Sequence, residues 1–326
     1  MHKFALAIVV LVVVAGCTGP RETKVDLNNG IIINAFSAFP PQARSGNTVL
    51  FDIDVENVGG TVAGNVEIEL IGIQDRWRDT TPKKEPITDT QKKGPFNLRP
   101  PSLDQNLPGD FITVQWELTT PRIAQGISPV LPVEARVKYN YNTSGYIDVF
   151  ALTRKQLELR ELANQPITST IVEVNSPGPL KMTVPDRFKA SPFIIDTDDT
   201  ATIQQQTLMI EFTNVGSGFP ITDGTAGKLT GLINITGPGT TFDRCFGKTL
   251  ATSDTDIIGK KAVRLESSDI LPRVREDGKF RIPCIINITK SAWATQPEGR
   301  ISLQFELFYS YFVSEEVAVQ VIGTGR

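Results

Sequence analysis

The sequence predicts an all-β protein that consists of two tandem antiparallel β-sandwich domains. The chain has 26 glycines and 22 prolines, and valine, isoleucine, threonine and phenylalanine fill the runs between them, which is typical of strands joined by turns. Phe51, Ile53 and Val55 share one side of such a run and the acidic residues between them share the other, which is the period of a half-buried strand. The order of these runs also repeats along the chain, which indicates two copies of one domain.

Segments 48–72 and 208–237 show the repeat most clearly. Each contains an alternating strand, an Asn-Val-Gly turn, a few small residues and a second alternating strand. Short alternating strands with Gly and Pro turns favour a sandwich of two antiparallel sheets in each copy, with a closed barrel as the alternative.

The end of each copy is predicted to be a hairpin. Segments 131–152 and 301–323 each have a strand with an aromatic end, a short turn and a closing strand. The two domains are therefore predicted to extend over 31–151 and 178–326.

One helix is predicted over 153–165, where Leu157, Leu159 and Leu162 are interleaved with charged residues. A Ser-Pro-Gly-Pro turn then marks the passage into the second copy. We assign 152–177 to this short helix and a linker near the domain junction. A helix that covers one end of a sheet, with no role at the junction, is the alternative.

The N-terminal segment has the pattern of a secretion signal. A basic start is followed by an apolar run from Phe4 to Ala15, which is shorter than the roughly 20 residues of a membrane-spanning helix and matches the core of a signal peptide. The sequence Val-Ala-Gly-Cys that ends at Cys17 resembles the lipobox of secreted lipoproteins, with valine where leucine is usual. The resemblance implies a signal peptide over 1–16, a lipid on Cys17 and a tether over 17–30. An uncleaved signal anchor is the alternative.

Composition excludes several classes of function. The net charge is −3 with mixed signs, which gives no electrostatic basis for nucleic-acid binding. The single histidine, His2, lies in the leader, so the mature chain cannot form a Ser-His-Asp triad, a Cys-His pair or a histidine metal site. No phosphate-binding loop or dinucleotide fingerprint is present. We therefore expect no cofactor and no enzyme activity, and carboxylate pairs that hydrolyse glycosides are the remaining catalytic alternative.

The Asn-Val-Gly turns carry a family resemblance. The pattern V-x-N-V-G-G-T-x-A between alternating strands resembles the CARDB group, which are immunoglobulin-like modules of bacterial and archaeal surface proteins. The leader and the duplicated sandwiches are similar to archaeal surface lipoproteins related to S-layer components. The resemblance covers 48–72 and 98–152 well and 208–323 more weakly. It implies an immunoglobulin-like fold and a surface location, and it brings no catalytic residues.

Candidate modified residues are few. Cys245 and Cys284 form an even pair in an exported chain, which favours a disulfide across a loop of about 40 residues over two buried thiols. Three sequons predict glycosylation sites at Asn142, which we place in a hairpin turn, and at Asn234 and Asn287 within strands.

Two further groups of residues are candidate binding sites. Oxygen ligands for calcium are offered by acidic turn residues, although neither turn completes an EF-hand pattern. These residues are Asp196, Asp198, Asp199, Asp254 and Asp256. The long connection 74–108 carries Trp77 between Arg76 and Arg78, which suits partner binding if the tryptophan is exposed. Trp77 covering a sheet edge is the alternative.

These observations predict a lipid-anchored protein on the outer face of the cell membrane. It would act in surface architecture or adhesion and bind a protein or polysaccharide of the envelope or the extracellular space without catalysis, with no nucleic-acid partner. The first alternative is a subunit of a surface filament that assembles by strand exchange, which would make the protein a homo-oligomer. The second is a carbohydrate-active enzyme that uses two carboxylates.

Overall fold

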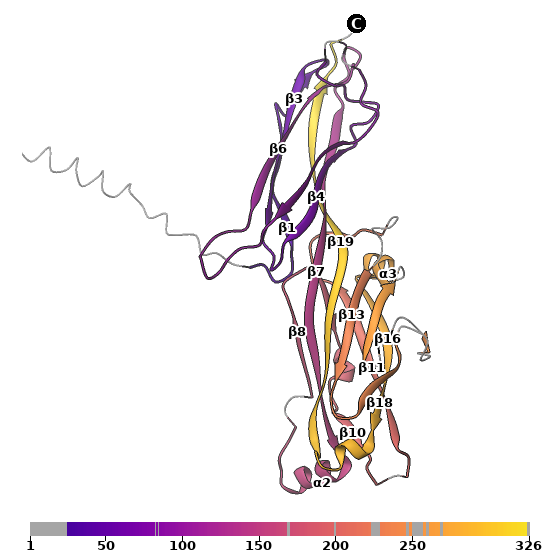
Figure 1. Cartoon of the computed structure of the whole chain (residues 1–326). Helices are drawn as coiled ribbons and strands as arrows, with labels where there is room; N and C mark the ends of the chain where they lie inside the picture. The colour runs from indigo at the N-terminus through magenta and orange to yellow at the C-terminus, as the bar shows by residue number, and fades with distance from the viewer. Residues whose placement is uncertain are drawn as a thin grey trace, which may run out of the picture.

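Two very long strands form the axis of the computed structural model (Figure 1). They are β7 (Val130–Thr153) and β19 (Glu298–Ile322), of 24 and 25 residues. They pair antiparallel without a register shift, from Val130 opposite Gln320 to Leu152 opposite Glu298. Apolar residues recur at nearly every second position of both strands and are buried. One face of this ladder therefore lines the core along the length of the molecule.

The described chain forms three sheets, of 3, 11 and 5 strands. The largest sheet contains β7 and β19 and passes through two lobes, each closed on its other face by one of the smaller sheets (Figure 1). The residues that the structure describes are 25–81, 83, 85–167, 170–198, 200–222, 229–245, 248–249, 257–258, 261–267 and 270–324.

Lobe 1 contains the first six strands. Their bounds are β1 (Ile31–Phe39), β2 (Gln42–Arg44), β3 (Thr48–Asn57), β4 (Ala63–Ile71), β5 (Gln91–Leu98) and β6 (Phe111–Thr119). The smaller sheet has the order β1-β3-β6. The facing sheet places β5 and β4 beside the first half of β7, and β2 beside the last residues of β19.

Lobe 2 contains more strands. Their bounds are β8 (Ile171–Asn175), β9 (Leu180–Thr183), β10 (Phe193–Ile195), β11 (Ile203–Asn214), β12 (Phe219–Pro220), β13 (Leu229–Thr236), β14 (Thr240–Cys245), β15 (Lys248–Thr249), β16 (Ile257–Ile258), β17 (Ala262–Ser267) and β18 (Lys279–Thr289). The smaller sheet has the order β15-β14-β18-β11-β9. In the facing sheet, β13 pairs with the first half of β19, and β8 and β10 pair with the second half of β7.

The fold confirms an all-β chain of antiparallel sheets, but the predicted hairpins are wrong. Asn142 lies opposite Phe308 in the middle of β7, where we expected a turn. The polar run after Tyr141 suggested a break, yet the inward positions keep their phase through Thr143 to Ile147. The chain therefore continues straight, because a partner strand of equal length is available for every residue.

The lobes do not coincide with the predicted segments 31–151 and 178–326. Residues 145–153 of β7 pair with β8 and β10 of lobe 2. Residues 320–322 of β19 pair with β2 of lobe 1. Each lobe is therefore completed by half a strand from the other copy, and the two lobes are not consecutive in sequence.

The predicted helix is present as α2 (Arg154–Leu162), with the Thr153 hydroxyl accepting a hydrogen bond from the Gln156 backbone N–H as its N-cap. It follows the end of β7 and contacts β10, at the outer end of lobe 2 rather than between the lobes (Figure 1). A second helix, α3 (Ile270–Asp277), was not predicted. Two 3₁₀ turns complete the described elements, Asp186–Phe188 and Lys290–Trp293.

Four tyrosines pack together at the middle of the ladder, where the two lobes meet. We call this region the waist. Tyr139 and Tyr141 of β7 lie opposite Tyr311 and Tyr309 of β19. Neighbouring rings have centroids 5.8–6.5 Å apart. The Tyr309 hydroxyl also hydrogen-bonds the buried Thr143 hydroxyl at 2.7 Å. The core of lobe 1 therefore continues into that of lobe 2 through an aromatic layer.

The waist tyrosines bind equivalent points of the two copies. The Tyr141 hydroxyl accepts a hydrogen bond from the Gly60 backbone N–H (2.9 Å), just after the first Asn-Val-Gly turn. The Tyr311 hydroxyl donates to the Asn214 side-chain oxygen (2.8 Å) in the second turn. In both turns the asparagine amide closes the turn, from Asn57 to Thr61 O and from Asn214 to Gly218 O, each at 2.9 Å. The repeated Asn-Val-Gly turn of the sequence is therefore also repeated in the structure. We call the contact between each turn and its tyrosine, Tyr141 or Tyr311, a joint.

Candidate functional site

The predicted disulfide is present in the structure. Cys245 on β14 and Cys284 on β18 lie directly opposite each other and are bonded. Both are buried, and their separation of 39 residues means that the bond closes a long loop of lobe 2. Lobe 2 is therefore covalently cross-linked within one sheet.

Trp77 does not form an exposed anchor, which corrects the more specific interpretation of the 74–108 connection. Its side chain is fully buried, and its ring meets Phe51 edge-on at 5.2 Å between centroids. Arg76 is exposed, whereas the Arg78 backbone pairs with Thr119 at the end of β6. Trp77 therefore closes the core of lobe 1 and is not available as an anchor for a partner.

The three sequon asparagines all lie within strands. Asn142 and Asn234 are half-buried on β7 and β13. The Asn287 amide donates to the Asp243 carboxylate (3.3 Å), and its oxygen accepts from Gln205 (3.2 Å). Glycosylation at these residues stays a prediction.

The calcium candidates are only partly described. Three of them, Asp199, Asp254 and Asp256, lie outside the described residues, as does the predicted lipidation residue Cys17. The Asp196 carboxylate forms an ion pair with Arg154 at the start of α2 (3.2 Å) and accepts from the Asp198 backbone N–H (3.3 Å). Its oxygens therefore already have partners, and the described part of the chain contains no cluster of three or more candidate metal ligands.

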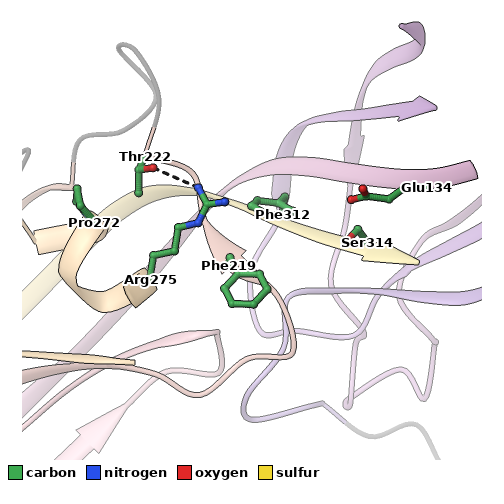
Figure 2. Close-up of a pocket in the computed structure, with 7 residues that line it drawn as sticks. All are labelled: Glu134, Phe219, Thr222, Pro272, Arg275, Phe312 and Ser314. Carbon is green, nitrogen blue, oxygen red and sulfur yellow. Dashed lines mark hydrogen bonds between the residues drawn. The ribbon is translucent and has the colours of Figure 1, made fainter. Parts of the chain in front are cut away.

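A hollow at the waist is a candidate binding site (Figure 2). We call it the waist pocket, and its volume is about 580 Å³. It lies on the outer face of the central ladder, where α3 and β12 of lobe 2 reach across towards lobe 1. Its lining residues are Glu134, Phe219, Thr222, Pro272, Arg275, Phe312 and Ser314.

Local structure explains why Arg275 points into this pocket. Ile270, Leu271 and Val274 are buried and fix α3 against the core, so the next residue, Arg275, projects from the edge of the helix. Its guanidinium donates to the Thr222 hydroxyl at 3.3 Å (Figure 2). This bond uses one of the five N–H donors of the guanidinium.

The centre of the pocket is Phe312 between two cations. Arg275 and Arg136 lie over its ring, with guanidinium carbons 5.6 and 4.8 Å from the centroid. Phe219 packs beside it at 5.9 Å and is 47 % exposed. Glu134 forms an ion pair with Arg136 at 3.0 Å. Phe312 itself is only 8 % exposed, so Phe219 is the aromatic ring that the pocket presents to solvent. A half-exposed aromatic ring beside arginine is typical of residues that dominate protein interfaces.

Sequence reasoning missed the waist pocket. Phe308 and Phe312 of β19 occupy outward positions of an alternating strand, and outward aromatics in such a strand are the signal that could have located an outer contact. The position of Arg275 could not be found in this way, because it depends on a helix that we did not predict.

A second hollow, of about 680 Å³, lies beside the loop between β5 and β6. A third, of about 420 Å³, lies beside α2. Among the described residues, each of the three hollows is lined by one carboxylate: Glu134, Asp110 and Glu161. Glu134 is paired with Arg136, and Asp110 with Arg99. Glycoside hydrolysis requires two carboxylates, and the described lining of each hollow supplies one.

Comparison with known proteins adds little to this geometry. No family model and no curated protein matches the chain, so the resemblance to CARDB modules stays a prediction. Among solved structures, the chain is similar to the Enterococcus faecalis MSCRAMM ACE, which binds its ligands by the collagen hug model. The TM-score is 0.17 and the identity 6 %, over 91 % of this chain and 97 % of that chain.

Two further structures give comparable scores. They are the infectious bursal disease virus VP2 subviral particle (TM-score 0.15, 10 % identity, 93 % and 80 % covered) and the collagen adhesin CNA from S. aureus (0.10, 10 %, 93 % and 96 %). Scores of this size carry no inference about function. The strand pairing therefore defines the class, an all-β protein of two sandwiches on one shared ladder. In the described part of the chain, no helix is long and apolar enough to cross a membrane.

Proposed function

We propose that this protein is an extracytoplasmic, membrane-tethered scaffold that binds an envelope or extracellular partner through the waist pocket, without catalysis. The observation that carries the proposal is the arrangement of Phe219, Phe312 and Arg275 in one open hollow. A partner there gains contact with the half-exposed Phe219 ring, which packs on Phe312, and with arginine donors. An acidic or aromatic segment of a protein fits this chemistry best.

Two further observations support an extracytoplasmic scaffold. The Cys245–Cys284 disulfide suits an oxidising compartment, and the leader ending at Cys17 has the pattern of a lipoprotein signal. The uninterrupted β7–β19 ladder joins both lobes without a linker, which suits a protein that holds a partner at a fixed place.

Assembly into a filament by strand exchange is the second candidate function. The second half of β7 and the second half of β19 each complete the lobe of the other copy within one chain. The exchange that a filament would need between molecules is thus satisfied internally for these two strands, which favours the scaffold.

The test is site-specific photo-crosslinking in cell envelopes. A benzophenone amino acid replaces Phe219 in the pocket or, as a control, Ile203 on β11, which is 51 % exposed. We expect a discrete adduct from position 219 alone. Arg275→Ala should abolish this adduct, whereas Arg273→Ala should not, although Arg273 lies on the same helix and also covers a phenylalanine ring (Phe280, 5.1 Å). Equal adducts from both positions, or an adduct unaffected by Arg275→Ala, would contradict the proposal.

A further inference from the structure

The loop between β5 and β6 of lobe 1 exposes several large apolar side chains. Leu103, Leu107 and Phe111 are 60 %, 53 % and 69 % exposed, and Val62 beside the loop is 48 % exposed. We call these four residues the tether-side patch. Leu107 and Phe111 also line the hollow of about 680 Å³ on this loop. A cluster of this kind on the surface marks a place of contact with a partner or a membrane.

The loop holds these side chains in fixed positions. Ser102 and Leu107 exchange two backbone hydrogen bonds, at 2.9 and 3.0 Å. At the base of the loop, the Arg99 guanidinium forms two hydrogen bonds with the Asp110 carboxylate (3.0 and 3.2 Å), and this contact lowers the pKa of Asp110. The exposed leucines therefore lie on an ordered turn that is closed at both ends.

The described chain begins beside this loop (Figure 1). The Asp26 backbone N–H donates to Val58 O at 2.7 Å. The adjacent residue, Asn57, donates its side-chain amide to Leu98 O (2.7 Å) and its backbone N–H to Asp110 O (3.0 Å). One turn of lobe 1 thus contacts the start of the described chain and both ends of the apolar loop.

The length of chain before Val25 limits the orientation of the molecule at a membrane. The eight peptide links from Cys17 to Val25 span at most about 29 Å. The tether leaves near the waist, where the Asn29 side chain accepts from Ser217 and the Tyr141 hydroxyl binds the adjacent turn. From Tyr141 to either end of β7 is roughly 35–40 Å at the rise of a strand. A molecule anchored at Cys17 therefore cannot stand upright on either end.

We propose that the tether-side patch docks onto the lipid surface and holds the long axis of the molecule along the membrane. This inference rests on the proposed anchor at Cys17. Leucine and phenylalanine side chains on an ordered loop are suited to insert between lipid headgroups, and a second apolar contact beside a lipid anchor makes membrane attachment more stable. The patch lies beside the point where the described chain begins, so it is among the surfaces that a tether of this length keeps close to the bilayer.

The experiment places a fluorescent reporter on the patch. The three native tryptophans are at most 5 % exposed, so a tryptophan on the surface gives a separate signal. Leu107→Trp is compared with Val130→Trp, since Val130 is 60 % exposed on the same lobe but lies at the far end of β7. Full-chain lipoprotein is reconstituted into vesicles of phosphatidylglycerol and phosphatidylcholine, with and without bromine on the phosphatidylcholine acyl chains.

We expect brominated lipid to quench the Leu107→Trp signal about twofold and to leave Val130→Trp unchanged. Equal quenching of both positions, quenching of Val130→Trp alone, or no quenching would overturn the docking surface. A Leu107→Trp signal that is shielded from iodide without bromine quenching would indicate a protein occupant, such as a second copy, and would also overturn it. Mass spectrometry of the N-terminal peptide tests the anchor separately, because an unmodified Cys17 contradicts lipidation whatever the quenching shows.

Discussion

The two lobes share one joint and differ in what has been added to it. In both, a tyrosine of the central ladder binds an Asn-Val-Gly turn whose asparagine closes the turn. Lobe 1 adds the apolar loop beside the start of the described chain. Lobe 2 adds a disulfide-linked sheet and α3, which carries Arg275. The repeated residues therefore serve the fold, whereas the candidate contact surfaces lie in segments that are not repeated.

Alkaline pH should have the largest effect on the shared joint. Burial raises the pKa of Tyr139, Tyr141, Tyr309 and Tyr311 above the ordinary value of 10.0. The unfolded chain then releases protons that the folded protein retains, so stability is complete below pH 10 and is lost as the pH rises further. Burial lowers the pKa of Lys181, which acts in the opposite direction but is one group against four.

Denaturant titrations from neutral pH upwards, followed by tyrosinate absorbance, measure this effect. The free energy of unfolding should be level below pH 10 and fall above it. If the joint is symmetric, Tyr139→Phe and Tyr309→Phe should each reduce the slope. A free energy that stays level well above pH 10 would show that the tyrosines ionise freely in the folded protein.

Removing a buried tryptophan should reveal how far the lobes depend on each other. Trp77→Ala in lobe 1 and Trp293→Ala in lobe 2 should each lower the free energy of unfolding by about 3–5 kcal/mol, because each leaves a large cavity. Since the lobes share β7 and β19, a single unfolding transition should shift in both variants. Calorimetry in which only one of two separate transitions moves would contradict this coupling.

The smallest effect should come from single hydroxyl groups at the joint. Tyr141→Phe leaves the Gly60 N–H without its tyrosine partner, and Tyr311→Phe removes the donor to Asn214. Each should cost about 1–2 kcal/mol, which is the usual range for a lost hydrogen bond of this kind. Chemical denaturation of the pair is the measurement. Costs that differ several-fold would show that the two turns are similar in sequence but unequal in energy.

Much of the fold could be predicted because it depends on local patterns. The alternation from Phe51 to Val55 and the two Asn-Val-Gly turns were sufficient to predict strands and a duplication. The path of β7 was not predictable in this way. The polar residues 142–145 resemble a turn, and only the equally long partner β19, more than 150 residues away in sequence, makes a straight strand favourable.

The candidate site was less predictable, because it depends on tertiary contacts. The Trp77 side chain has charged neighbours in the sequence, but it packs on Phe51 from another segment. Arg136 and Arg275 meet on Phe312 from three distant parts of the chain. The cysteine pair was the exception, because Cys245 and Cys284 are the two cysteines left once Cys17 is assigned to a lipid, which restricts the choice to one bond.

The shared ladder also determines when the protein can fold during its synthesis. Lobe 1 contains the earliest strands, yet it needs residues 309–322 of β19 to cover the exposed edge of β7. Until the ribosome has made that strand, lobe 1 has an unpaired edge that is able to bind other strands. Pairing over so large a sequence separation is also slow. A chain of this design is therefore most open to aggregation while its last strand is still unmade, and a chaperone that covers the edge of β7 would give the greatest protection at that stage.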